Sequence, residues 1–95
     1  MEEIIWSSRA RNDAKVIHEY IALDSKYYAN KWLDRIAARI SVLPKHPYIG
    51  RVVPEKKDDN IREVFLGKYR IMYSLKQLPQ IVVYRIIHST RMFNE

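Results

Sequence analysis

The sequence predicts an α+β fold with the element order β-α-α-β-β-β, in which a helical hairpin lies on one face of a small, mainly antiparallel sheet. Apolar residues recur at helical spacing in two segments of the first half, 8–24 and 25–43. They alternate with polar residues over 69–76, and a nearly continuous apolar run covers 81–88. We expect residues 1–95 to form a single domain, because so short a chain does not divide into two packed cores.

One strand and two helices are expected before residue 44. Residues 4–6, Ile-Ile-Trp, form a short β-prone run. Ser7 or Ser8 then suits the N-cap of the first helix, and Ser25 suits that of the second. The first apolar stripe consists of Ala10, Ala14, Ile17 and Ile21. The second consists of Ala29, Trp32, Leu33, Ile36, Ile40 and Leu43. The tight connection between the two segments predicts an antiparallel pair.

A loop and three strands are expected in the second half. Residues 44–60 contain three of the four prolines, which is typical of a loop. Strands are predicted over 61–66, 69–76 and 81–88. The apolar run of the last strand indicates a place inside the sheet, with most of both faces covered.

Strand alternation decides where Arg70 points. Tyr69, Ile71 and Tyr73 form the natural core face, so Arg70 projects from the opposite side. Because a helical hairpin covers one face only, we expect the other face to be a partly open, basic surface around Arg70. Its expected neighbours are Arg62, Arg85, His88 and Arg91.

Composition and charge narrow the function classes. The net charge is +6, from 17 Lys and Arg against 11 Asp and Glu, and residues 61–95 hold 6 basic and 2 acidic side chains. Such a field favours encounters with polyanions, although solubility alone is the simpler explanation. The absence of cysteine excludes a disulfide scaffold, a thiolate zinc site and a cysteine nucleophile. No apolar run suits a membrane span or a secretory signal, so we expect a cytoplasmic protein without a membrane partner.

Local motifs exclude several further kinds of site. Gly50 and Gly67 stand alone, which argues against a glycine-rich phosphate loop. The three histidines lack metal-ligand spacing, so no metal and no cofactor is expected. His88 follows a predicted strand and has the chemistry of an acid or base near neutral pH. A structural hydrogen bond at the strand end is the interpretation that the sequence favours for it.

Arg70 is the sharpest single candidate for binding. Its guanidinium is a fixed fork of donors that matches phosphate or carboxylate. The alternative is an ion pair within the chain with Glu63, which the alternation assigns to the opposite face. For Tyr27, Tyr28 and Trp32 we favour packing or a partner surface over stacking on nucleic-acid bases.

Four segments follow one another along the chain in a specific order. They are IIWSSRARND at 4–13, PYIG at 47–50, IREVFLGKYRIMYSL at 61–75 and IVVYRIIHSTR at 81–91. Within them lie the pair Arg62-Glu63, the block YRIMY at 69–73 and the block HSTR at 88–91. In this combination the chain resembles the RelE/ParE superfamily of toxins from type II toxin–antitoxin systems, over nearly its whole length.

The resemblance implies a small basic growth inhibitor that a cognate antitoxin wraps and neutralises. RelE-like members cut messenger RNA on the ribosome, whereas ParE-like members poison DNA gyrase and are not catalysts. For a RelE-like protein the resemblance makes Arg70, His88 and Arg91 the catalytic residues, because phosphodiester cleavage needs proton transfer and cations at the transition state. The residues expected to bind nucleic acid or another target are Arg62, Arg70, Arg85 and Arg91. The resemblance matches Arg62, Arg70 and Arg91 to basic positions of the RelE-like nucleases, and Arg70 to their transition-state arginine.

Two departures from the cleaving members favour gyrase poisoning. Many of those members carry a second basic residue where this chain has Val64. Many also carry a tyrosine in a longer tail, where this chain has only Phe93 before Glu95. A RelE-like ribosome-dependent mRNA endonuclease is the alternative, and a non-toxic basic nucleic-acid-binding domain is a third reading.

The partners follow from these readings. We expect a cognate acidic antitoxin that is partly disordered before it binds, since the chain is strongly basic. The target is DNA gyrase, or the ribosome and mRNA in the alternative. A homodimer and a toxin–antitoxin hetero-oligomer are both open.

Overall fold

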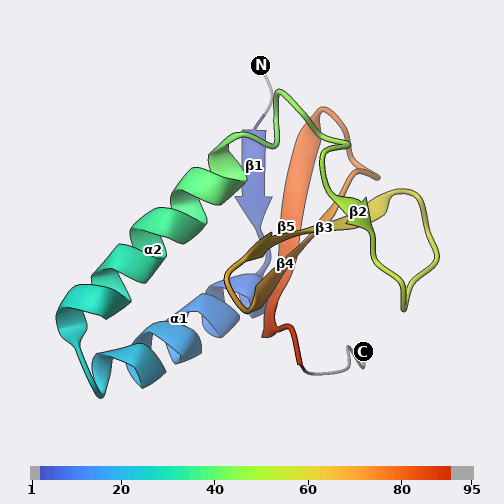
Figure 1. Cartoon of the computed structure of the whole chain (residues 1–95). Coiled ribbons are helices and arrows are strands. Elements are labelled where there is room, and N and C mark those ends of the chain that lie inside the picture. The colour runs from blue at the N-terminus through green and yellow to red at the C-terminus, as the bar shows by residue number, and fades with distance from the viewer. Residues whose placement is uncertain (1–2, 91–95) are drawn as a thin grey trace.

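The computed structural model describes residues 3–90 and has the predicted α+β architecture, with two helices packed on a mostly antiparallel sheet (Figure 1). The helices are α1 (Ser8–Ala22) and α2 (Lys26–Ser41). The strands are β1 (Glu3–Trp6), β2 (Arg51–Val52), β3 (Ile61–Leu66), β4 (Tyr69–Ser74) and β5 (Gln80–His88).

The strands form one five-stranded sheet in the order β1-β5-β4-β3-β2. β1 runs parallel to β5, and the other neighbours are antiparallel. β5 lies inside the sheet, as its apolar run predicts. The sequence missed β2, which falls in the expected loop, because two residues are too few to show an alternating pattern.

The two helices begin at the serines that the sequence indicates. Ser7 Oγ accepts a hydrogen bond from the Ala10 N–H at 3.0 Å, and Ser25 Oγ accepts one from the Tyr28 N–H at 3.1 Å. The helices form the projecting hairpin at the left of Figure 1. None of the helices within residues 3–90 has the length and apolar character that a membrane crossing requires.

The main core lies between this hairpin and one face of the sheet. The predicted stripes supply most of it, but Leu33 is 38% exposed, so its assignment to the core is wrong. From the sheet, the core takes Val64, Ile71, Tyr73, Ile81, Val83 and Ile86. The sheet face that carries these side chains is called the helix face below, and the opposite face is called the far face.

The far face is covered too, which contradicts the predicted open surface. Val53, just after β2, packs with Ile61, Met72 and Ile87 in a second apolar cluster. The segment that follows β2 therefore folds over the far face. A single buried valine in a charged loop carries no periodicity, which is why the sequence pattern did not reveal this cover.

Candidate functional site

Arg70 lies at the centre of a partly buried ion cluster on the far face. The residue is only 4% exposed. Its Nε donates to Glu63 Oε1 at 2.6 Å, and its two terminal nitrogens donate to the two oxygens of Glu55 at 2.9 and 2.8 Å. Glu63 Oε2 accepts a further hydrogen bond from Arg51 Nε at 2.7 Å. The far-face ion cluster thus balances Arg51 and Arg70 against Glu55 and Glu63.

The strand register explains how Glu63 comes to face Arg70. Glu63 lies opposite Met72, and Phe65 lies opposite Arg70, with no irregularity between β3 and β4. Glu63 and Arg70 therefore share the far face, and the assignment of Glu63 to the other side is wrong. Val64 lies on the helix face, so the apolar residues of β3 are divided between both faces and do not identify the core side.

The outward direction predicted for Arg70 is correct, but its predicted exposure is wrong. A hollow of about 330 Å³ lies beside it, lined among others by Arg51, Phe65 and Ser89. The guanidinium nevertheless already donates three hydrogen bonds to two carboxylates. Hydrogen bonds and charge from Glu55, and then from Glu63, raise the pKa of Arg70 above its usual value despite its burial. Arg70 is therefore a permanent cation whose charge is already matched.

Arg62 does not join Arg70, contrary to expectation. It lies opposite Tyr73 in the register and so points to the helix face. Its Nε donates to the carbonyl of Asp59 at 2.9 Å, and its Nη1 donates to that of Gly50 at 3.0 Å. Its guanidinium also stacks over the Tyr48 ring at 5.0 Å. Arg62 holds the loop before β2 in place.

Arg85 is also committed to a partner within the fold. Its Nε donates to Asp13 Oδ2 of α1 at 2.8 Å, and the same oxygen accepts the Ile86 N–H at 2.9 Å. An irregularity in the pairing of β4 with β5, between Met72 and Tyr73, accompanies this change of direction along β5. Arg85 thus points toward the helices, and its expected place beside Arg70 is wrong.

His88 lies at the end of β5 and makes the structural contacts that the sequence favours. Its Nδ1 accepts the Thr90 N–H at 3.3 Å, and its ring meets the edge of Tyr69 at 5.5 Å. Tyr69 belongs to the helix side of the sheet, so His88 is not a neighbour of the Arg70 guanidinium. Arg91, the remaining candidate, falls outside the described residues.

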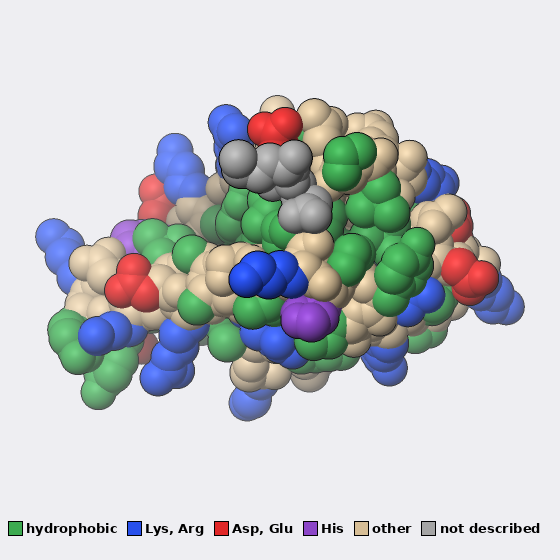
Figure 2. Space-filling model, turned by 90° about the horizontal axis from the view of Figure 1, so that it is seen from above, with side chains coloured by type: hydrophobic (Ala, Val, Ile, Leu, Met, Phe, Trp, Pro, Cys, Tyr) green, Lys and Arg blue, Asp and Glu red, His purple; other side chains and the backbone are tan. Residues whose placement is uncertain are grey.

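The described candidates therefore lie on different faces and form no common patch. In the view of Figure 2 the Lys and Arg side chains are scattered over the face and around its edge, with acidic side chains among them. Within residues 3–90, no group of three or more His, Asp or Glu side chains is placed to hold a metal ion.

Two residues that the sequence pattern does not place beside Arg70 do most to fix the site. Glu55 accepts hydrogen bonds from both terminal nitrogens of Arg70. Glu55 belongs to the loop expected over 44–60, and the prolines and charges of that loop do not indicate that it covers the sheet. Gly50 lies against Tyr73, whose hydroxyl accepts the Gly50 N–H at 3.0 Å and donates to the Pro47 carbonyl at 2.8 Å. A Cβ at position 50 would lie 2.5 Å from the Glu63 carbonyl oxygen. The PYIG segment is thereby tied to the strand pair that carries Glu63 and Arg70.

Comparison with known proteins assigns the family. The family model described as the ParE toxin of the type II toxin–antitoxin system parDE matches residues 4–93. The chain belongs to the ParE toxin family. A solved structure titled "Chromosomal ParDE TA system from P. aeruginosa" has the same fold, with a TM-score of 0.75 and 21% identity over 93% of this chain and 96% of that one. No curated protein matched the sequence. Within the wider RelE/ParE superfamily, the ParE-like assignment agrees with the sequence analysis.

Proposed function

We propose that this ParE-family chain inhibits growth by poisoning DNA gyrase and does not cleave RNA. The observation that carries this choice between the two superfamily mechanisms is the far-face ion cluster. The residue that matches the transition-state arginine of the nucleases is buried and bonded to Glu55 and Glu63.

The electrostatics of this cluster are unfavourable for a phosphodiester. A phosphate would have to displace the Glu55 carboxylate, which already binds the guanidinium in a bidentate fashion, and it would bring negative charge beside Glu63. Cleavage also needs proton-transfer groups within hydrogen-bond reach of the same phosphate. Arg62 and Arg85 are bonded elsewhere and point away from Arg70. The described arginines therefore do not assemble around one phosphate, and this arrangement fits a protein that acts by binding better than it fits a nuclease.

The proposal includes a cognate antitoxin and action in the cytoplasm. The family name places such toxins in a two-component system, and the net charge of +6 suits an acidic segment that folds on contact. Exposed aromatic side chains, such as Tyr20, Tyr27 and Tyr28, offer apolar contact area for a protein partner.

Growth tests separate a toxin from a simple nucleic-acid-binding domain. The chain is induced in a bacterium with and without the reading frame encoded beside its gene. Growth arrest that the neighbouring frame relieves is the expected result, and that frame should encode a short acidic protein. Normal growth at a verified level of folded protein would contradict the proposal.

Assays with purified components separate the two toxin mechanisms. The test compares the wild-type chain with a Glu63→Leu/Arg70→Met double variant, because replacing a buried ion pair with apolar residues often preserves stability. The proposal predicts that both proteins trap cleaved DNA on gyrase and that neither cuts mRNA on ribosomes. Glu19→Ala, on the exposed side of α1, is the matched control. Cuts in ribosome-bound mRNA by the wild type would support the nuclease instead.

A further inference from the structure

A small notch opens between α2 and the turn that joins β3 to β4. It has a volume of about 230 Å³. Its lining includes Trp32, Arg35, Leu66, Lys68, Tyr69 and His88. This α2 notch lies on the helix side of the sheet, away from the far-face ion cluster.

Trp32, one of the lining residues, carries a hydrogen-bond donor that has no partner within the described fold. The residue is 9% exposed, and its Nε1 is buried with no acceptor among the described residues. Its ring is held by an edge contact with Tyr69, at 5.4 Å between centroids. An unpaired buried N–H is unfavourable, so an acceptor that a ligand brings, directly or through one water, reduces that cost.

The charges around the notch favour an anion as that acceptor. Arg35 comes from α2 and Lys68 from the turn, so two cations flank the opening. Both are exposed, and no ion pair of either side chain is found within residues 3–90. None of the residues that line the notch is acidic. Two cations and one N–H donor around a concave site match a carboxylate or a phosphate oxygen.

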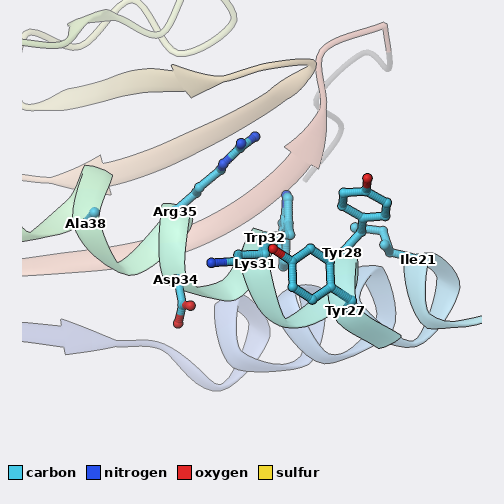
Figure 3. A pocket seen from close by; sticks show the side chains of 8 residues that line it. All are labelled: Ile21, Tyr27, Tyr28, Lys31, Trp32, Asp34, Arg35 and Ala38. Carbon is cyan, nitrogen blue, oxygen red and sulfur yellow. The ribbon is translucent and has the colours of Figure 1, made fainter. Parts of the chain in front are cut away.

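The surface next to the notch favours a carboxylate on a protein segment. A second hollow of about 690 Å³ shares Trp32 and Arg35 with it, and Tyr27 and Tyr28 stand at its other end (Figure 3). These tyrosines are 63% and 66% exposed. Asp34 also lines this hollow, which is unfavourable for a run of phosphates. Exposed aromatic rings beside a cationic notch are typical of sites for a peptide with an apolar anchor and an acidic side chain.

We propose that the α2 notch binds an aspartate or glutamate side chain of a partner protein, with the neighbouring hollow taking an apolar residue of the same segment. Trp32 Nε1–H, Arg35 and Lys68 are the groups that recognise the carboxylate. The inference rests on the proposed function only for the origin of that segment, since the antitoxin is the expected acidic partner. The recognition itself is a property of the chain alone.

Nuclear magnetic resonance on the full chain tests this directly. The two tryptophans give two indole N–H signals, and Trp6 in β1 serves as an internal reference. The probes are the peptides acetyl-Leu-Glu-Glu-Leu-amide and acetyl-Leu-Gln-Gln-Leu-amide, with inorganic phosphate at equal ionic strength. We expect the Glu peptide to move the Trp32 signal saturably, to leave Trp6 unchanged and to bind at least about tenfold more tightly than the Gln peptide.

Variants assign the effect to the notch. Arg35→Ala/Lys68→Ala should weaken binding of the Glu peptide by about tenfold or more, whereas Lys45→Ala, an exposed lysine outside the notch, should not. Equal binding of the two peptides, an unmoved Trp32 signal, or full binding by the double variant would overturn the inference. A stronger response to phosphate than to the Glu peptide would also overturn it in favour of a nucleic-acid ligand. Because these readouts involve neither growth nor gyrase, they stand or fall separately from the proposed function.

Discussion

Glu55 accepts two hydrogen bonds from the Arg70 guanidinium, at 2.9 and 2.8 Å, and so occupies the pair of N–H groups that a phosphate oxygen pair would need. Arg70, the residue that matches the transition-state arginine of the nucleases, is thus paired with a carboxylate of its own chain. The same segment covers the far face and pairs with Arg70, because Glu55 comes two residues after Val53, which packs on that face. Arg70 accordingly belongs to the architecture of the protein.

Glu63 is the residue on which the ion cluster depends most. Its fully buried side chain accepts hydrogen bonds from both Arg70 and Arg51. Glu63→Ala leaves Arg70 buried with one carboxylate fewer, and we expect a loss of about 3–5 kcal/mol in the free energy of unfolding. Urea denaturation measures it, with the exposed Glu19→Ala as control. A loss below about 1 kcal/mol would show that the cluster contributes little.

Gly50 should tolerate no side chain. A Cβ there would lie 2.5 Å from the backbone oxygen of Glu63 and 2.6 Å from the Tyr73 hydroxyl. We expect Gly50→Ala to destabilise the protein by about 1–3 kcal/mol, because a backbone carbonyl cannot easily move aside. Gly67→Asn is the comparison, since nothing lies near a Cβ at that turn and asparagine accepts its positive φ of 55°. Equal stability of the Gly50→Ala and wild-type proteins in thermal unfolding would refute the close approach.

Tyr73 should make stability fall at alkaline pH. Burial raises the pKa of its hydroxyl above the ordinary value of 10.0, so the folded state favours the protonated form. Its contribution is complete below pH 10.0 and is lost progressively as the pH rises through the folded-state pKa.

Comparison with Tyr73→Phe isolates this dependence. The variant lacks the titrating hydroxyl, and it also loses the bonds to Gly50 and Pro47. We expect it to be less stable than the wild type by about 1–3 kcal/mol at pH 8, with a gap that narrows as the pH rises above 10. Urea denaturation at several pH values measures the gap, and a gap that widens with pH would contradict the assignment.

Asp13 should tie α1 to β5. Its carboxylate accepts hydrogen bonds from Arg85 and from the Ile86 N–H. Asp13→Ala removes both, and we expect a loss of about 2–3 kcal/mol, since hydrogen bonds to a charged group are the stronger kind. The exposed Asp24→Ala, at the hairpin connection, is the control in denaturant unfolding. Similar effects of the two substitutions would argue against a structural role for the Asp13 contact.

The sequence predicts the fold of this protein much better than it predicts the site. Helix stripes, serine caps and strand alternation are local signals, and the structure confirms the elements that they indicate. The face on which Glu63 lies depends on the register between β3 and β4. The sequence of β3 alone does not indicate that face, because Ile61 and Val64 are both apolar and lie on opposite faces.

The pairing of the candidate arginines depends on still longer-range contacts. Asp13 and Arg85 are 72 positions apart, and Glu55 reaches Arg70 from a loop without periodic pattern. An arginine within a strand indicates that its charged group has a binding partner. Whether the partner is a ligand or a carboxylate of the same chain is decided only when the distant segments meet.

The most direct test of the account is the cleavage of supercoiled DNA by purified gyrase in the presence of the wild-type chain and of Glu63→Leu/Arg70→Met. A gyrase poison in which Arg70 is structural should trap cleaved DNA in both reactions, to within about twofold once the folded fraction is matched. No trapped DNA in either reaction, together with cuts in ribosome-bound mRNA that only the wild type produces, would contradict it.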